Sequence, residues 1–509
     1  MPPFLLEGDR ACHSFFGNAK VHHHVEDRPA RSPRRHRPLF AGERREDFVE
    51  PLVLITQVLE NFAQWIAGSR HPNILPRIPQ GDTSSPHAAP PTVGPVNDTH
   101  TGPVNNERTG PLRGLRVLEL GVILAGPFVG RMLADFGAEV IKVESPDQGD
   151  PMRDWGSVRA DGPNGARALW WPFLARNKKA ITLDLRQSEG QDLALKLLDE
   201  CDVLVENFKP GTLERWGLGP EVLQKRNPRL IIARVSGYGQ QGPYAHRPGY
   251  ASAGEAAGGL RYLNGFPDQP PPRMGLSIGD SLAGMFALHG VMLALYERDV
   301  HSGKGQIVDV GITDACLAVS ESVTTEFAKL GTIRQPQGVR LSHVVPSNLY
   351  TSRDGRRVVI AANSDSLWSR LCTVMNRPDL AADDRYATDA GRRTHADELD
   401  REIMTWAASI NFAELAEALD AGGVVFGPVN NAEDLVNDPH FRSNGSLITL
   451  HDPELGDLVG PGIVPRLSAT PGAVHHTGHW SLGHDNNEVF EGLGISADQQ
   501  QLLRDRHVI

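Results

Sequence analysis

Asp280 is the residue whose type and surroundings point most clearly to chemistry. It ends the stretch Ser-Ile-Gly-Asp at 277–280, and apolar residues at helical spacing follow it as far as Tyr296. This pattern predicts a largely buried helix with Asp280 in the N-cap position. The aligned backbone dipoles of a helix favour an anion at that end. The carboxylate could therefore cap its own helix, or it could attack an activated acyl group as a nucleophile.

The cysteines and histidines show no arrangement that would predict a metal centre. Four cysteines are scattered along the chain at Cys12, Cys201, Cys316 and Cys372. Their spacing fits neither a disulfide framework nor a zinc site, and it suits a reducing compartment. A run of histidines at 22–24 has no further ligand at useful spacing. We therefore expect no metal site and no permanently bound cofactor.

A nicotinamide dinucleotide site is the alternative to consider for the glycines that follow the first expected strand. Gly121, Gly126 and Gly130 are spaced differently from the G-x-G-x-x-G fingerprint. In that reading Glu144 would be the acid that binds the ribose. The mismatch in spacing makes the dinucleotide interpretation weak.

Composition narrows the class of protein. The 509 residues are 40% hydrophobic and 22% charged, which is ordinary for a globular protein of two or three domains. A formal net charge of −11 disfavours nucleic acid as the main partner. We find no apolar run of membrane-spanning length and no signal-peptide core at the N-terminus. We expect a cytoplasmic protein without a membrane partner, and organelle targeting is left open.

The elements that must position Asp280 alternate between strands and helices. We expect a strand at 116–120, a tight loop at 121–126, a helix with Pro127 at its first position, and a strand at 139–144. Such a β-α-β unit builds a parallel sheet. Further strands are expected at 181–185, 203–206, 230–235 and 307–310. The fold class is therefore α/β, and the loop at 237–250 should cross the carboxyl edge of the sheet, where ligands bind.

Two other parts of the chain differ in composition from this alternating region. Residues 1–110 are rich in proline, histidine and arginine, and they cannot bury enough apolar surface to fold alone. We expect a disordered extension there. The large domain would begin in 111–332, and 333–440 would form a linker and a smaller α/β domain.

Eight short stretches, in this order and spacing, resemble the family III CoA-transferases, also called the CaiB/BaiF family. They are Leu-Arg-Val-Leu-Glu-Leu at 115–120, the run 133–144, Asn-Lys-Lys at 177–179, Val-Glu-Asn-Phe at 205–208 with Pro-Gly at 210–211, Gly-Tyr-Gly at 237–239, Gly-Asp at 279–280, Ser-Gly-Lys-Gly-Gln at 302–306, and Gly-Pro-Val at 427–429. The resemblance covers roughly residues 112–509 and leaves the N-terminal extension outside.

The resemblance implies a fold and a reaction. It implies a Rossmann-like large domain built from both ends of the ordered chain, with 441–509 returning to complete it, and an interlocked homodimer. The implied activity moves CoA from an acyl-CoA to a small carboxylic or dicarboxylic acid. Asp280 matches the family's catalytic aspartate, which forms an acyl anhydride and then an aspartyl-CoA thioester. Acyl-CoA and the acid are substrates.

Binding residues also follow from the resemblance, position by position. Ala125 matches a pantetheine contact, and Tyr250 matches a tyrosine beside the thioester. The nucleotide-binding segment is matched by Leu183, Arg186, Asn207, Phe208, Lys209 and Arg215. Arg273, just ahead of Asp280, is a candidate for the second carboxylate of a dicarboxylic acid. Leu124 replaces a glutamine of some formyl-CoA transferases, which disfavours oxalate and formate as substrates.

Two alternatives to CoA transfer stay open at this point. The family also contains α-methylacyl-CoA racemases, which use a histidine and an aspartate where this chain has Tyr250 and Ala251. A tyrosine of ordinary pKa is a poor base at neutral pH, so the racemase interpretation is disfavoured. The other alternative is a catalytically silent CoA-binding homologue in which Asp280 only caps its helix.

Overall fold

The structure is a computed structural model, and it describes residues 109–156, 159–341 and 343–509. The expected N-terminal extension, residues 1–110, lies outside the described residues except for its last two positions. The expectation that it is disordered therefore stays a prediction.

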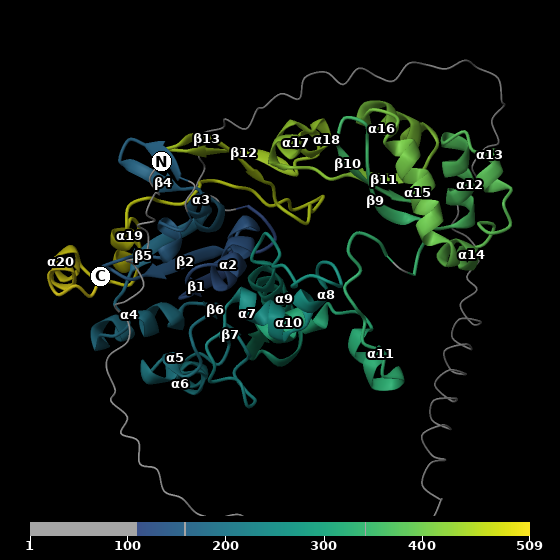
Figure 1. The fold of residues 1–509 in the computed structure, drawn as a ribbon. Coiled ribbons are helices and arrows are strands. Elements are labelled where there is room, and N and C mark those ends of the chain that lie inside the picture. The colour runs from purple at the N-terminus through teal and green to yellow at the C-terminus, as the bar shows by residue number, and fades with distance from the viewer. Residues whose placement is uncertain (1–108, 157–158, 342) are drawn as a thin grey trace, which may run out of the picture. The chain divides into compact units, whose positions relative to one another are not determined.

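Six parallel strands form the central sheet of the large domain (Figure 1). They are β1 (Arg116–Glu119), β2 (Glu139–Glu144), β5 (Lys178–Thr182), β6 (Val203–Glu206), β7 (Ile231–Ser236) and β8 (Ile307–Gly311). Their spatial order is β5-β2-β1-β6-β7-β8, which along the chain is the doubly wound order of a Rossmann sheet. The predicted α/β class is confirmed. The order reverses between β1 and β6, and ligands bind at the carboxyl ends of strands beside such a reversal.

Helices cover both faces of this sheet, because successive side chains of a buried strand point to opposite sides. In β1, Leu118 packs with α4 (Ser188–Asp199), α6 (Pro220–Arg226) and the C-terminal helices. Its neighbour Val117 packs with α2 (Ala125–Asp135), α9 (Ile278–Tyr296) and α10 (Ile312–Ala318). The two apolar cores place the sheet between helix layers. Shorter helices complete the region: α3 (Trp170–Ala175), α5 (Thr212–Arg215), α7 (Ala251–Ala257), α8 (Leu260–Leu263) and α11 (Val323–Leu330).

Three predicted boundaries were wrong. The strand expected at 181–185 is β5, which begins three residues earlier and ends at Thr182. Pro127 is the third residue of α2 and not the first. Asp280 is also the third residue of its helix, because α9 begins at Ile278 and Ser277 is its N-cap residue. The prediction that Asp280 caps the helix was therefore wrong, and its carboxylate lies within the first helical turn.

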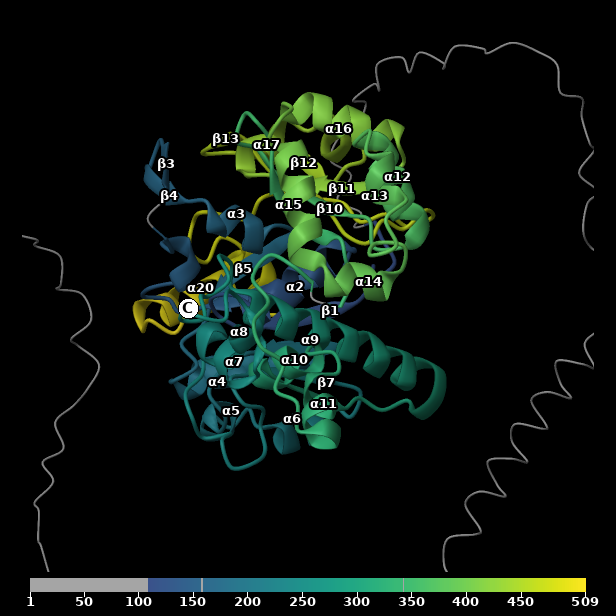
Figure 2. The same cartoon turned by 45° about the vertical axis from the view of Figure 1, so that its right-hand side comes forward.

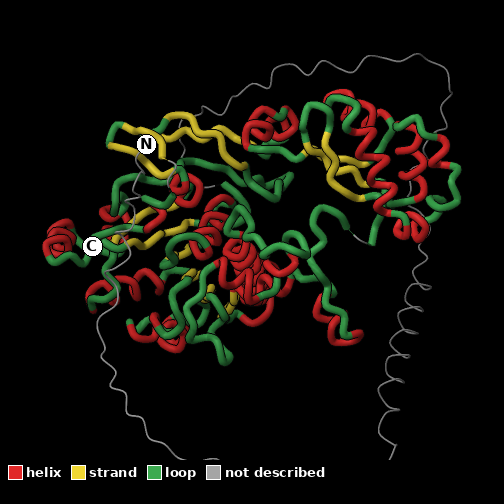
Figure 3. Tube along the Cα trace, in the orientation of Figure 1, coloured by secondary structure: helices red, strands yellow, loops and turns green. Residues whose placement is uncertain are grey.

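A smaller unit lies between residues 345 and 443. Its antiparallel sheet has the order β11-β10-β9, formed by β9 (Ser347–Thr351), β10 (Arg357–Ala361) and β11 (Val425–Pro428). Its helices are α12 (Asp365–Val374), α13 (Pro378–Ala381), α14 (Asp389–Thr394), α15 (Ala396–Ala407), α16 (Phe412–Ala421), α17 (Ala432–Asn437) and α18 (Pro439–Ser443). Figure 3 shows this group of helices around its short strands. Its apolar core includes Tyr350, Trp368 and Leu399.

The last part of the chain packs along the free edge of the central sheet. After the hairpin of β12 (Leu447–Asp452) and β13 (Gly456–Pro461), the chain reaches α19 (Asn486–Gly492), which contacts β5, and α20 (Ala497–Asp505) (Figure 1). Asp485 and Asn486 accept hydrogen bonds from the backbone N–H groups of Ala180 and Thr182, at 2.6 and 2.9 Å. These side chains satisfy donors that an edge strand would otherwise leave open. A second hairpin, β3 (Arg159–Gly162) with β4 (Gly165–Ala168), lies nearby (Figure 2).

One described stretch, residues 278–302, is long and apolar enough to cross a membrane by length and composition. Most of it is α9, which contacts α2, α10, β7 and β8. Ala283, Ala287 and Val291 have no more than 1% of their surface exposed. One face of this helix therefore packs in the core of the large domain. The expectation that no apolar run reaches membrane-spanning length is corrected by this stretch.

Candidate active site

The loop that follows β1 is tied to the loop that follows β6, across the point where the strand order reverses. The Asn207 side chain accepts a hydrogen bond from the Val122 backbone N–H and donates one to the Val122 carbonyl, both at 2.8 Å. The backbone of Ile123 has a φ of 67°, in the left-handed region that residues with a side chain rarely adopt. Its N–H donates to the Asp150 carboxylate at 3.1 Å, which holds it there. The loop is thus fixed before any ligand binds.

A buried network of charges supports the same loop from below. The Lys142 ammonium lies 3.1 Å from Glu119, 2.7 Å from Asp150, and 2.9 Å from the carbonyl oxygen of Gly121. Lys178 pairs with the other oxygen of Glu119 at 2.7 Å. The carboxylates raise the pKa of Lys142 despite burial, so it stays charged. Because a buried charge is stable only when it is paired, this network fixes the positions of its members and of the loop.

The first turn of α9 lies beside this loop because of the crossover topology. A helix that connects two parallel strands runs antiparallel to them, so the N-terminus of α9 lies at the carboxyl edge of the sheet. Gly284, one turn after Asp280, permits close contact with α2. A Cβ atom at Gly284 would lie 3.1 Å from the carbonyl oxygen of Ala125 and 2.9 Å from the Phe128 ring. The structure thus brings Asp280 and the predicted pantetheine contact Ala125 to one end of two packed helices.

Asp280 has an unusual electrostatic environment. Its side chain is half-buried, and burial together with the nearby carboxyl of Glu255 raises its pKa from 3.8 to about 6. The favourable interaction with the helix dipole is typically about 0.3–1 kcal/mol, and it does not offset burial here. The aspartate is therefore a relatively basic carboxylate that is still mostly ionised at neutral pH. That combination suits a nucleophile.

The residues predicted to bind the nucleotide differ in how accessible they are. Leu183 is 2% exposed and packs in the core, so its side chain does not face solvent. Arg186 is exposed and pairs with Asp184 at 2.7 Å. Lys209 is exposed, and Arg215 is exposed and donates to the Thr212 hydroxyl at 2.9 Å. Three exposed cations therefore follow β5 and β6: Arg186 and Lys209 lie in the loops after these strands, and Arg215 ends helix α5, as phosphate binding would require.

The remaining predicted residues border the loop between the strands. Asn207 binds Val122 and does not cap a helix, so its observed role is to position the loop. The Phe208 ring packs edge-on against Trp216 with centroids 5.2 Å apart. Tyr250 is the N-cap residue of α7 and is 76% exposed. Arg273 is exposed and forms no hydrogen bond or ion pair with any described residue.

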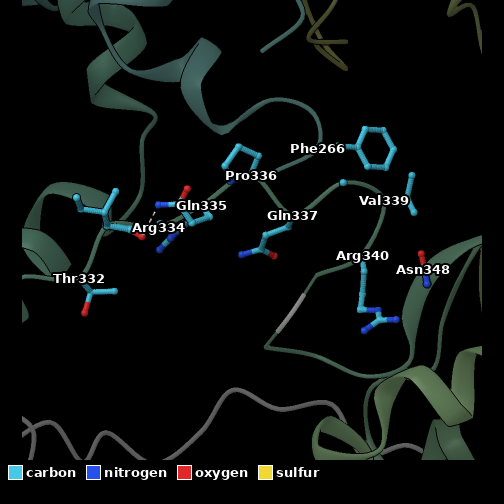
Figure 4. A pocket seen from close by; sticks show the side chains of 11 residues that line it. Phe266, Thr332, Arg334, Gln335, Pro336, Gln337, Val339, Arg340 and Asn348 are labelled. Atoms are coloured by element: carbon cyan, nitrogen blue, oxygen red, sulfur yellow. Dashed lines mark hydrogen bonds between the residues drawn. The ribbon is translucent and has the colours of Figure 1, made fainter. Parts of the chain in front are cut away.

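A pocket seen in Figure 4 lies elsewhere. Its lining comes from residues 332–340 together with Phe266 and Asn348. None of the predicted site residues lines it. Arg340 in this wall pairs with the buried Asp400 at 2.7 Å. We therefore assign the chemistry to the carboxyl edge of the sheet and not to this pocket.

The structure also argues against the alternative in which a nicotinamide dinucleotide binds here and Glu144, at the end of β2, contacts its ribose. The Glu144 carboxylate accepts two hydrogen bonds from the Arg153 guanidinium, both at 2.7 Å, and is 2% exposed. A buried carboxylate that already accepts two hydrogen bonds from an arginine is not available to bind a ribose. Glu144 is instead a structural anion.

Glu255 is a residue of this site that the sequence analysis missed. It lies in α7, is 1% exposed, and accepts a hydrogen bond from the Gly279 backbone N–H at 3.3 Å. It is the only charged residue in the stretch Ala-Ser-Ala-Gly-Glu-Ala-Ala at 251–257. The sequence signal for this residue was a single acid among small residues. Small residues let a helix pack closely on its neighbours, and close packing buries the acid.

The family model for CoA-transferase family III matches residues 112–486, most of the described chain. The chain belongs to CoA-transferase family III. It is a transferase that uses CoA thioesters as substrates. The predicted family is thereby confirmed, and the catalytically silent alternative loses its support.

The chain is also similar to proteins that are named as CoA-transferases. Succinyl-CoA–D-citramalate CoA-transferase of Chloroflexus aurantiacus is 50% identical over 396 residues, covering 78% of this chain and 97% of that protein. The alpha subunit of succinyl-CoA–L-malate CoA-transferase of the same organism is 39% identical over 433 residues, covering 85% of this chain and 100% of that protein. A CaiB/BaiF family protein from Brucella suis has a solved structure that is 32% identical, with a TM-score of 0.68, covering 76% of this chain and all of that one.

Proposed function

We propose that this family III CoA-transferase moves CoA from succinyl-CoA to a dicarboxylic acid, with Asp280 as the nucleophile. The observation that carries the proposal is the basic, half-buried carboxylate of Asp280 beside the loop at the reversal of strand order. Support for the substrates comes from the family III relatives, which are named for succinyl-CoA and for D-citramalate or L-malate. Both of those acceptors carry two carboxylates.

The proposed reaction proceeds in balanced steps at Asp280. A carboxylate oxygen attacks the thioester carbonyl, the carbon–sulfur bond breaks, and CoA leaves as a thiolate. The thiolate then attacks the Asp280 carbonyl of the resulting anhydride, which releases succinate and leaves an aspartyl-CoA thioester. The carboxylate of the acceptor attacks this thioester and expels the thiolate again, which gives a second anhydride. Attack of the thiolate on the acceptor carbonyl forms the new acyl-CoA and restores Asp280.

Arg273 is the group proposed to bind the second carboxylate of the acid. It is exposed, free of partners among the described residues, and seven positions before Asp280. A guanidinium recognises a carboxylate through two parallel N–H···O bonds, which gives both charge and orientation. In the same proposal, Arg186, Lys209 and Arg215 contact the phosphates of CoA. Arg186 would exchange its partner Asp184 for a phosphate oxygen on binding.

We also propose that the protein acts as an interlocked homodimer. Large apolar side chains are more than half exposed on α9 at Met285, Leu293 and Tyr296, and on α11 at Phe327 and Leu330. Large apolar side chains exposed to this degree on two helices are typical of surfaces that another protein chain covers. Light scattering on the full chain should give the mass of two chains. A particle with the mass of one chain would contradict this part of the proposal.

The reaction is tested with purified protein, succinyl-CoA and a panel of acids. We expect CoA transfer to D-citramalate or L-malate, and little transfer to acetate, which lacks a second carboxylate. With succinyl-CoA alone, mass spectrometry of the intact protein should detect a covalent CoA adduct, and mass spectrometry after proteolysis should place it on the peptide that contains Asp280. Asp280→Asn should abolish both the adduct and the transfer. Undiminished transfer by that variant would refute the proposal.

A further inference from the structure

Glu255 lies in the protein interior directly behind the first turn of α9. Helices α7, α9 and α10 pack closely there: a Cβ atom at Gly279 would lie 3.1 Å from the Ala251 carbonyl oxygen and 3.3 Å from the Glu255 Cγ atom. The Glu255 carboxyl accepts the Gly279 N–H at 3.3 Å, and Gly279 precedes Asp280 directly. A change at Glu255 is therefore transmitted to Asp280 through one peptide unit.

No cation neutralises this buried carboxyl. Glu255 forms no ion pair with any residue that the structure describes, although it is 1% exposed. Burial of an unpaired carboxylate is costly, so the position needs a reason other than stability. Among the residues that the structure describes, the one hydrogen bond of this carboxyl leads to the turn that carries Asp280.

Few other titratable groups face this pair of carboxyls. From α10, Cys316 is fully buried beside both, and burial together with the two acids raises its thiol pKa to about 11, so it stays neutral. Asp314, also on α10, faces the Gly239 and Gly311 backbone instead. From α8, Arg261 donates to the Pro271 carbonyl at 3.2 Å and forms no ion pair with Glu255. Glu255 and Asp280 therefore form an isolated pair.

We propose that Glu255 is a positioning residue for Asp280: its buried carboxyl holds the Gly279 backbone N–H and thereby orients the first turn of α9, which carries the Asp280 carboxylate. This inference rests on the proposed role of Asp280 as the nucleophile. A more basic carboxylate is a stronger nucleophile, provided that it is still ionised at the working pH. The nearby Glu255 carboxyl raises the pKa of Asp280, and this makes the ionised Asp280 carboxylate more basic.

The test is the pH dependence of kcat/KM for transfer from succinyl-CoA, whose acid limb reports ionisation of the free enzyme. The wild-type limb should lie near the Asp280 pKa of about 6. Glu255→Gln keeps the shape and the acceptor oxygen for Gly279 but removes the charge. Burial causes more of the rise in the Asp280 pKa than Glu255 does. We therefore expect the acid limb of Glu255→Gln to move to lower pH by roughly half to one pH unit. At pH 8, kcat should fall about twofold to threefold, as expected for a weaker nucleophile.

Two further variants separate charge and geometry from general damage. Glu255→Asp keeps the charge on a shorter side chain, so the limb should stay near its wild-type position while kcat falls. Asp400→Asn removes a different buried carboxylate, which binds Asn348 and Tyr350 in the smaller unit. That control should lower thermal stability and leave the acid limb in place.

Each outcome is decisive. An acid limb that stays in place in Glu255→Gln would overturn the inference, whether or not the variant loses rate or stability. The same limb shift in Asp400→Asn would also overturn it. If Asp280→Asn still transferred CoA, the proposed function itself would fail. If Asp280→Asn is inactive and the limb of Glu255→Gln is unmoved, only the role of Glu255 fails.

Discussion

Replacing Asp280 with asparagine should make the protein more stable while it abolishes activity. The folded-state pKa of Asp280 is raised from 3.8 to about 6, so ionisation of this side chain opposes folding. A difference of roughly two pKa units corresponds to about 3 kcal/mol at pH values where both states are ionised. Loss of the favourable helix-dipole interaction in the variant removes about 0.3–1 kcal/mol of that gain. The expected net gain is therefore about 2 kcal/mol.

The sign of the pH dependence makes this prediction specific. Below about pH 3 the aspartate is mostly protonated in both states, so Asp280→Asn should not yet gain free energy of unfolding relative to the wild type. Between pH 4 and 6 the unfolded chain releases a proton that the folded protein retains, and the wild type loses stability relative to the variant. Above about pH 7 the difference should be constant. Urea unfolding at about pH 3, 4, 5, 6 and 8 measures the whole curve.

If the difference in the free energy of unfolding between Asp280→Asn and the wild type does not change with pH, the reasoning is refuted. If Asp280→Asn gains nothing at pH 8, Asp280 does not have a raised pKa in the folded protein, and its environment is not the one described above. Asp379→Asn is a suitable control, because Arg377 lowers the pKa of Asp379 in the folded protein. That variant should show no gain in stability at pH 8.

Three further predictions concern the groups around Asp280. Arg273→Ala should raise KM for a dicarboxylate acceptor about tenfold or more, because a charge-assisted hydrogen bond is lost, and should affect KM for succinyl-CoA less. Equal effects on the KM values of every acid would contradict the proposed contact. Asn207→Ala should lower the free energy of unfolding measured in urea by about 1–3 kcal/mol and raise KM for acyl-CoA, because the Val122 backbone loses both of its hydrogen bonds to this side chain. An unchanged KM would show that the loop needs no support. Lys142→Met should lower the free energy of unfolding by about 3–5 kcal/mol, because Glu119 and Asp150 lose a buried cation. Lys179→Met, which removes a half-buried ion pair, should lower it by less than about 1 kcal/mol. Equal losses in the two variants would contradict the role of the network.

Two strands of the central sheet were predicted with the bounds that the structure has. They are β2 and β6, where β-branched and aliphatic residues at most positions indicate a buried parallel strand although charged residues stand among them. The start of β5 was not predictable in the same way. Lys178 and Lys179 are rarely found in buried strands, and Lys178 is buried only because Glu119, from another strand, neutralises it. A partner 59 positions away in sequence gives no local signal.

The site was predictable in part, for a similar reason. Asp280 stood out because a long apolar helix follows it, and the helix N-terminus does lie at the carboxyl edge of the sheet. Its burial and its neighbour Glu255 depend on how α7 packs on α9, which the small residues of α7 permit but do not specify. Likewise, Leu183 fits the family pattern, yet its side chain packs into the core.

The closure of the β5 edge by Asp485 and Asn486 has a consequence for biosynthesis. These contacts join residues about 300 positions apart, so strand β5 emerges from the ribosome long before the groups that cover it. During that interval its open backbone donors are available to other nascent chains. We expect translation that stops before residue 485 to yield aggregates, and chaperone demand to be highest for this window of synthesis.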